Sequence, residues 1–231
     1  MSVRTQLKGQ SVNKIILGET CLCEYQLYRT GIIDGTHGCF DSIKINLDGV
    51  AAIIENDFEY ILSNEHLKFM QYEYYPGVTY LKWINTKYSL DIDNMFSWPV
   101  YSLFHLDNMQ GGRESYQRKI NRTRLMFEDD NPTILFYYYR YSENYNVHLM
   151  LSKTSALIKL LEDKYNKQFK ASVMTYMPSD NNFIQITTTD KLHHTMFHST
   201  TSWIETDDNW SGECNNPLFD EYANNLQEWI K

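Results

Sequence analysis

The segment Thr133–Tyr139, T-I-L-F-Y-Y-Y, limits most strongly what this chain can fold into. After its first residue it is apolar or aromatic throughout, and Pro132 and Arg140 bound it. A run of this length without alternating polar residues is typical of a strand that is covered on both faces, as in a parallel sheet. Parallel neighbours need long crossover connections, which are usually helices. The segment therefore predicts an α/β protein.

Other predicted strands and helices alternate along the sequence around this segment. The apolar run Ile15–Leu17 predicts a first strand, and residues 21–30 predict a helix that Gly31 ends. Residues 47–63 carry apolar residues at helical spacing, with Asn46 or Asp48 as the cap. Further elements are expected as strands over 95–104, 169–176 and 183–188 and as helices from Gly111-Gly112 to about Glu128, over 148–165 and over 217–230.

Aromatic and β-branched runs lie on both sides of Pro76-Gly77 and predict a β-hairpin over residues 68–84. We therefore expect a single α/β domain over residues 1–231, in which helices flank a mostly parallel central sheet and the hairpin is an insertion. Residues 1–12 are expected to be a flexible or peripheral segment.

The overall charge and hydropathy exclude several classes of protein. The formal net charge of -8 argues against general nucleic-acid binding, which needs clustered basic residues. The chain has neither a signal-peptide pattern nor an apolar run of the roughly 18 residues that span a bilayer, so we expect a cytoplasmic protein that does not insert into membranes. Phosphate-binding glycine loops are also absent, and we expect no cofactor and no metal. The oligomeric state has no signature in the sequence.

Cys21 is the leading candidate for a reactive group. In K-I-I-L-G-E-T-C-L-C-E-Y-Q-L it stands where the predicted first strand gives way to a helix. Unpaired backbone N–H groups at a helix N-terminus lower the pKa of a thiol and favour the nucleophilic thiolate. The alternative interpretation is a small, buried and inert cysteine.

A thiol nucleophile needs a base, and His105 is the leading candidate. It lies in S-L-F-H-L-D-N, where a predicted strand turns polar. Because Cys21 and His105 both follow predicted strands, we expect them at the carboxyl edge of the sheet, where active sites of such sheets lie. Asp41 and Asp107 both qualify as the group that orients the base. The alternative for His105 is a structural histidine at a strand end.

Three arginines of one predicted helix are candidates for binding a substrate. Arg118, Arg122 and Arg124 include an i, i+4 pair, and a guanidinium group suits a carboxylate or phosphate. They indicate an unknown substrate of anionic character. The alternative is a solvated surface or structural ion pairs.

Five segments in order resemble a known family. They are I-L-G-E-T-C-L-C-E-Y-Q-L, G-C-F-D-S, I-I-E-N-D-F-E-Y-I-L, F-H-L-D, and Y-Q-R-K-I-N-R-T-R-L followed by T-I-L-F-Y-Y-Y. Together they are similar to the uncharacterised family of putative papain-like cysteine peptidases over roughly residues 13–176. The resemblance implies Cys21 as nucleophile, His105 as base and Asp41 as a polar partner. It implies a thiol hydrolase more strongly than proteolysis.

The chain departs from the family pattern at two positions. Ser42 stands where the family has a tryptophan, and Leu106 separates His105 from Asp107. Both departures affect the choice of the third catalytic group.

Two other classes of function stay open. Asp91-Ile92-Asp93 is a D-x-D sequence of the kind with which glycosyltransferases hold a divalent metal, which predicts a metal-dependent sugar transferase. A non-catalytic binding or scaffold protein is the other alternative. His193, His194 and His198 would include an i, i+4 pair in a helix, but the flanking Thr and Ser favour a loop.

Overall fold

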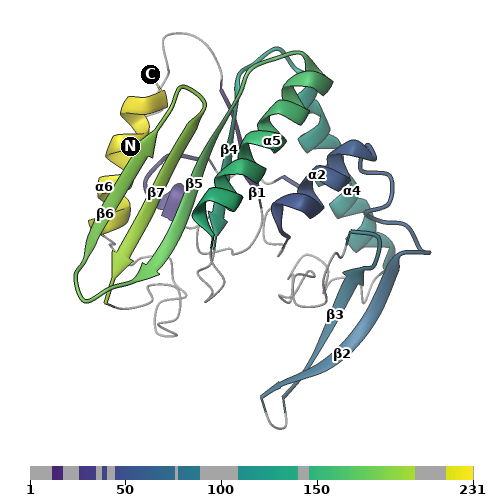
Figure 1. The fold of residues 1–231 in the computed structure, drawn as a ribbon. Helices are drawn as coiled ribbons and strands as arrows, with labels where there is room; N and C mark the ends of the chain where they lie inside the picture. Colours follow the sequence, from purple (N-terminus) through teal and green to yellow (C-terminus); the bar gives the residue numbers. More distant parts are fainter. Residues whose placement is uncertain are drawn as a thin grey trace.

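The core of the protein is a five-stranded sheet with the order β1-β4-β5-β7-β6 (Figure 1). Neighbouring strands are parallel except at the β6–β7 pair, which is antiparallel. This confirms the predicted α/β fold with a mostly parallel sheet. The strands are β1 (Asn13–Leu17), β4 (Thr133–Tyr139), β5 (Phe169–Pro178), β6 (Phe183–Thr188) and β7 (Leu192–Ser199). The computed structural model describes residues 12–17, 26–34, 38–40, 45–75, 78–88, 109–139, 146–200 and 217–230.

Helices cover both faces of the sheet (Figure 1). Helices α2 (Leu47–Glu55), α4 (Met109–Glu128) and α5 (Val147–Tyr165) contribute to the hydrophobic cluster on one face. Helix α6 (Pro217–Ile230) and the short helical segment 26–29 contribute to the cluster on the other.

The position of β4 inside the sheet explains why apolar and polar residues do not alternate in its sequence. Successive side chains of a strand point to opposite faces. Leu135 and Tyr137 pack in the cluster with α2, α4 and α5, whereas Phe136 and Tyr138 pack in the cluster with α6. Both faces of β4 are therefore covered, and its side chains from Thr133 to Tyr138 are all buried.

Local sequence signals set two helix ends. Asn46 caps α2, and its side-chain oxygen accepts a hydrogen bond from the Gly49 amide at 2.8 Å. Gly31 follows the helical segment 26–29 with a φ of +70°, and the Ile32 amide donates to the Leu27 carbonyl at 2.9 Å. This is the left-handed helix ending that glycine favours, and it confirms the predicted role of Gly31.

Helix α2 is shorter than the sequence predicted, because it ends at Glu55 rather than near residue 63. Asp57 and Phe58 have φ values of 50° and 64°, which an α-helix does not accommodate. The side chains of Phe58 and Ile61 are nevertheless buried in the same core. The residues after Glu55 therefore form turns, although their apolar side chains still pack in the core. Helix α4 begins at Met109, two residues before the predicted start.

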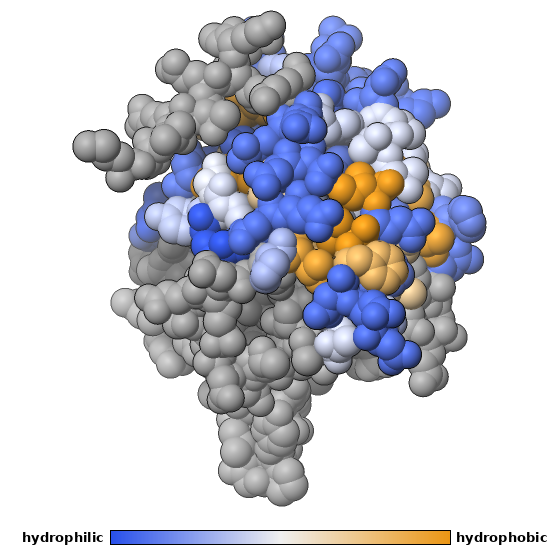
Figure 2. Space-filling model, turned by 90° about the vertical axis from the view of Figure 1, so that its left-hand side faces the viewer, coloured by the Kyte–Doolittle hydropathy of each residue, from blue (hydrophilic) through white to orange (hydrophobic). Residues whose placement is uncertain are grey.

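Residues 192–199 form strand β7, which corrects the expectation of a loop or helix around His193, His194 and His198. β7 lies between β5 and the antiparallel strand β6. Figure 2 views the side of the molecule where β6 lies and shows an apolar patch among hydrophilic residues. Phe183 of β6 is 44% exposed, and its ring stacks on His198 at a centroid distance of 4.2 Å.

The predicted hairpin is confirmed by β2 (Leu67–Tyr75) and β3 (Val78–Asn85), which pair antiparallel and project from the body of the protein (Figure 1). Asn85, the last residue of β3, fixes the base of this hairpin. This buried side chain donates to the carbonyls of Tyr60 and Ile61 at 2.6 and 3.1 Å and accepts from the Lys87 amide at 3.0 Å. Among the described helices, none is long and apolar enough to cross a membrane.

Candidate functional site

The predicted catalytic residues belong to segments that adjoin described strands and helices. Cys21, His105, Asp41 and Asp107 are all outside the described residues, as are Asp91 and Asp93 of the alternative site. The structure therefore defines the surrounding scaffold: the strand before Cys21, the helix after His105 and the residues before Asp41.

Strand β1 leads toward Cys21. Its residues pair in parallel with β4, from Asn13 opposite Thr133 to Leu17 opposite Tyr137, so the two strands end at the same edge. This carboxyl edge is at the bottom of Figure 1, where the arrowheads of β5 and β7 point. Cys21 follows Leu17 by four residues. Carboxyl edges of parallel sheets are the usual position of active sites.

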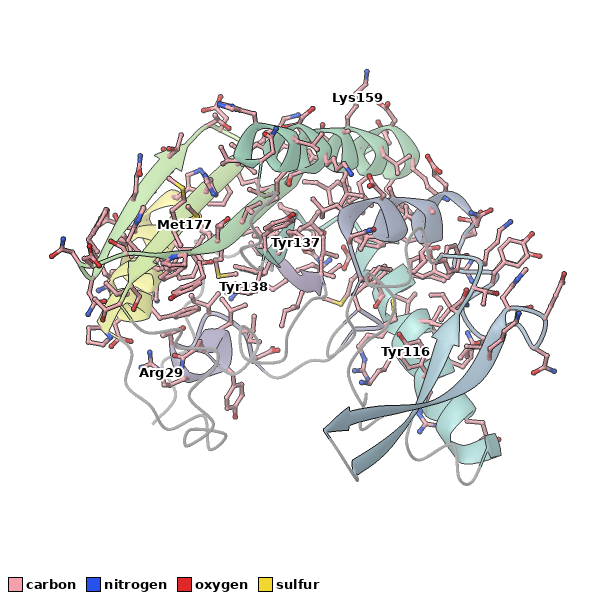
Figure 3. All side chains as sticks on the ribbon, turned by 60° about the horizontal axis from the view of Figure 1, so that its bottom comes forward. Arg29, Tyr116, Tyr137, Tyr138, Lys159 and Met177 are labelled. Carbon is pink, nitrogen blue, oxygen red and sulfur yellow. The ribbon has the colours of Figure 1, made fainter. Side chains whose placement is uncertain are left out.

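The chain after Cys21 is held against both β1 and α6. The Lys14 ammonium group of β1 donates a hydrogen bond to the Ile32 carbonyl. Burial lowers the pKa of Lys14, and the nearby charge of Asp34 opposes that shift. Arg29, labelled in Figure 3, pairs with Asp220 of α6 at 2.6 Å. Residues 26–34, which follow the segment that contains Cys21, are therefore fixed to both β1 and α6.

The residues just before Asp41 are anchored on α4. The Cys39 amide donates a hydrogen bond to the Thr123 hydroxyl at 2.9 Å, and the Tyr116 hydroxyl donates to the Cys39 carbonyl. Phe40 is fully buried, and its ring centroid lies 6.0 Å from that of Phe58. Figure 3 shows Tyr116 on α4. Cys39 is therefore fixed on α4, and Phe40, the residue before Asp41, is fixed in the core.

Helix α4 runs from the carboxyl edge of the sheet toward the amino edge. The carbonyl of Met126, near the end of α4, accepts hydrogen bonds from Asn13 at 2.8 Å and from Lys167 at 2.7 Å. These two residues stand at or just before the beginnings of β1 and β5. The first residue of α4, Met109, therefore lies toward the opposite edge, and His105 precedes it by four residues.

The three predicted substrate-binding arginines have different surroundings on α4. Arg118 and Arg122 are exposed, whereas Arg124 is half-buried and its guanidinium lies 5.8 Å from the centroid of the Phe58 ring. The Lys164 ammonium group holds the pKa of the Asp57 carboxyl below its usual value, and Arg124 adds to this effect. Arg124 therefore takes part in packing and charge balance at the end of α2.

One comparison with known proteins identifies the family. The sequence profile of the family described as "Putative papain-like cysteine peptidase (DUF1796)" matches residues 13–174, which is more than half of the chain. The chain belongs to this family. Searches of curated proteins and of solved structures found no match.

The region matched by this papain-like peptidase family begins at the first residue of β1 and ends within β5. It includes the positions of Cys21, Asp41 and His105 and the whole of α4. Helix α6 lies beyond it.

Sequence reasoning missed a buried polar cluster outside the predicted site. The Ser172 hydroxyl lies 2.9 Å from the Tyr222 hydroxyl and 3.4 Å from His193 Nδ1. On the opposite face of β7, His194 Nε2 lies 3.3 Å from the Thr175 hydroxyl. Ser172 and His193 are far apart in sequence from Tyr222, and only the sheet and α6 bring these three residues together. The sequence contains no local signal for this cluster.

Burial lowers the pKa of His193 and of His194 to about 4, so both rings are neutral at pH 7. Because neighbouring side chains of a strand point in opposite directions, these two histidines cannot ligate the same ion. In the part of the chain that the structure describes, no group of three His, Cys, Asp or Glu residues is arranged to hold a metal.

Proposed function

We propose that the protein is a thiol hydrolase that cleaves an acyl or amide bond, with Cys21 as nucleophile and His105 as acid and base. The single observation that carries the proposal is membership of the papain-like cysteine peptidase family over residues 13–174. The positions of β1 and α4 are consistent with this proposal. β1 ends at the carboxyl edge of the sheet four residues before Cys21, and α4, which starts four residues after His105, begins toward the same edge.

The proposed reaction uses the thiol of Cys21 and the imidazole of His105 in two steps. His105 takes the proton of the Cys21 thiol, and the sulfur attacks the carbonyl carbon of the substrate. A C–S bond forms and the bond to the leaving amine or alcohol breaks, while His105 gives its proton to the leaving group. Water then attacks the thioester, with His105 taking a proton from the water and returning it to the departing Cys21 sulfur.

Asp41 and Asp107 are the alternative groups for orienting His105. We favour Asp41 because it directly follows Cys39, which is hydrogen-bonded to α4, the helix after His105, and Phe40, which is fully buried against Phe58. If Asp41 orients the imidazole, Asp41→Asn lowers kcat while Asp107→Asn does not.

Arg118 and Arg122 are proposed to bind an anionic part of the substrate. Both lie on the exposed surface of the helix that follows His105, four residues and thus about one turn apart. Arg124 contributes less in this proposal, because its guanidinium already packs over Phe58.

Capture of the acyl-enzyme tests this function. The protein is incubated with a panel of activated esters and peptide amides, quenched in acid and mapped by mass spectrometry. The proposal predicts an acyl adduct on Cys21 that Cys21→Ala abolishes and that Cys23→Ala, the matched control two residues away, retains. Turnover that persists in Cys21→Ala would contradict the proposal.

A further inference from the structure

We propose that α6 is an acid-released latch: protonation of the buried His193 ring undocks α6 from the sheet, while β4 and the helices on the other face stay folded. The proposal does not depend on the chemistry of Cys21, because it concerns the sheet face that α6 covers. Helix α6 also lies outside the family match, which ends at residue 174. The latch therefore goes beyond both the family assignment and the proposed function.

Helix α6 covers its face of the sheet with one side of the helix. The ring of Phe219 stacks on that of Phe197 of β7 with a centroid distance of 5.9 Å. Near the end of α6, the Trp229 indole donates a hydrogen bond to the Thr189 carbonyl at 2.8 Å. Among the described residues, the hydrophobic cluster on the other face contains none from α6. Undocking of α6 would therefore uncover one face and leave the packing of the other face in place.

A buried polar cluster lies between α6 and the sheet. The His193 side chain is 1% exposed, and its Nδ1 lies 3.4 Å from the hydroxyl oxygens of Ser172 and Thr195. The Ser172 hydroxyl of β5 also lies 2.9 Å from the Tyr222 hydroxyl of α6. Ser172 therefore connects the imidazole to the helix.

The neutral ring and the protonated ring place different demands on these hydroxyls. A neutral imidazole can accept a hydrogen bond at Nδ1 from Ser172, whose oxygen then accepts from Tyr222. An imidazolium has an N–H group on both nitrogens and accepts no hydrogen bond. If Ser172 accepts from the ring, its own proton turns toward Tyr222, and Tyr222 no longer donates to it. Protonation of His193 therefore disturbs a polar contact that joins α6 to β5.

The described surroundings of His193 do not stabilise a positive ring. Among the described residues, no carboxylate forms an ion pair with His193, and its buried Nε2 has no hydrogen-bond partner. On α6, Asp220 pairs with Arg29, and the other two carboxylates belong to exposed residues, Glu221 and Glu228. An imidazolium under α6 would therefore be a buried charge without a counter-charge.

The other ionisable groups near this ring are basic. The His193 ring lies 5.4 Å from the Trp229 ring, and the Lys170 ammonium group of β5 lies 4.9 Å from the same indole. His194 is the next residue of β7 and points to the opposite face of the sheet. Burial lowers the pKa of His193 to about 4, and His194 adds to this effect, whereas the His193 backbone opposes it.

Undocking would return the His193 ring to water, where its pKa is 6.5. Between pH 6.5 and 4 the undocked form binds more protons than the docked form, so acid favours undocking. For this one group, the equilibrium constant for opening of α6 rises about 20-fold from pH 7 to pH 5. His194 does not contribute to this local step, because α6 does not cover its side of the sheet.

The test is hydrogen–deuterium exchange of the full-length protein at pH 7 and pH 5, measured on peptides by mass spectrometry. Dividing each exchange rate by the intrinsic rate at the same pH gives the opening constant of each segment. In the wild type, we expect α6 to open more readily than β4 at both pH values, and its opening constant to rise about 20-fold at pH 5. An α6 that shows no rise, or that opens only together with β4, would overturn the proposal.

Three variants test whether His193 causes the rise, and circular dichroism reports whether each is folded. His193→Asn should reduce the rise to less than about twofold. His194→Asn, the matched control on the opposite face, should keep the full rise. Tyr222→Phe removes the contact with Ser172 and should increase opening of α6 at both pH values. A full rise in folded His193→Asn would overturn the proposal, and if this variant does not fold, the comparison of α6 with β4 in the wild type decides.

Discussion

The Cys39 amide and the Thr123 hydroxyl form a buried hydrogen bond of 2.9 Å across 84 residues of sequence. The Thr123 hydroxyl can at the same time donate to the Lys119 carbonyl, one turn earlier in α4, at 3.1 Å. The bond connects α4 to the residues before Asp41 and is completed by the Tyr116 hydroxyl on the Cys39 carbonyl.

Removing the Thr123 hydroxyl should therefore destabilise the fold. Thr123→Val keeps the shape of the side chain but leaves the buried Cys39 amide without its acceptor, and we expect the free energy of unfolding to fall by about 1–3 kcal/mol. Thr123→Ser retains the hydroxyl and should lose less. Urea denaturation measures both variants. Equal stability of Thr123→Val and the wild type would show that the bond contributes nothing.

The aromatic centre of the core should be sensitive to truncation. Phe127 is fully buried, and its ring packs against Tyr165 and Phe169 at centroid distances of 5.4 and 5.9 Å. We expect Phe127→Ala to lower the free energy of unfolding by about 3–5 kcal/mol. Leu125→Ala is the control on the same helix. Leu125 is 65% exposed, and its truncation should change stability by about 0.5 kcal/mol or less. Similar losses for the two variants would contradict the assigned burial.

The buried histidines of β7 should make the fold sensitive to acid. Burial lowers the folded-state pKa of His193 and of His194 from 6.5 to about 4. Between these values the unfolded chain binds more protons than the folded one, so stability falls as the pH drops from 6.5 to 4, by on the order of 3 kcal/mol for each histidine. Urea unfolding at pH 7, 5.5 and 4.5 measures this slope.

Substitution of one buried histidine tests whether these histidines cause the acid sensitivity. His193→Asn should reduce the slope of stability against pH in this window. His148→Asn, at an exposed position of α5, should leave the slope unchanged. An unchanged slope in His193→Asn would contradict the assignment.

Much of the fold follows from the sequence where local pattern and packing agree. β4 matches its predicted range because its burial on both faces selects apolar residues at every position. β7 was missed because its buried histidines have polar partners, Ser172 and Thr175, on a neighbouring strand, and so the apolar pattern of a strand does not develop. The end of α2 was missed because Phe58 remains in the core after the backbone leaves the helix.

Local sequence patterns predict the candidate site less well than they predict the fold. A cysteine at a strand end and a distant histidine are each common, and only their order along the chain pointed to one family. The ion pair between Arg29 and Asp220 joins residues 191 positions apart, so periodicity and local composition contain no signal for it.

The exposed arginines of α4 should favour anionic reagents at the thiol. We expect Arg118→Gln to reduce the rate of Cys21 alkylation by iodoacetate about twofold or more relative to iodoacetamide at low ionic strength, because a guanidinium at the proposed site attracts the anionic reagent but not the neutral one, and the ratio of the two rates cancels any change in the thiolate fraction. Lys159→Gln is the control, since this exposed lysine of α5 points away from the body of the protein (Figure 3). Equal effects of the two substitutions would argue against an anion site on α4.

The central claim is that Cys21 and His105 act as a pair. Its most direct measurement is the pH dependence of Cys21 alkylation by iodoacetamide in the wild type and in His105→Asn. The account predicts a thiol pKa well below 8.5 in the wild type and a return to about 8.5 in the variant. A wild-type Cys21 that already titrates near 8.5, or a lowered pKa that His105→Asn leaves unchanged, would contradict it.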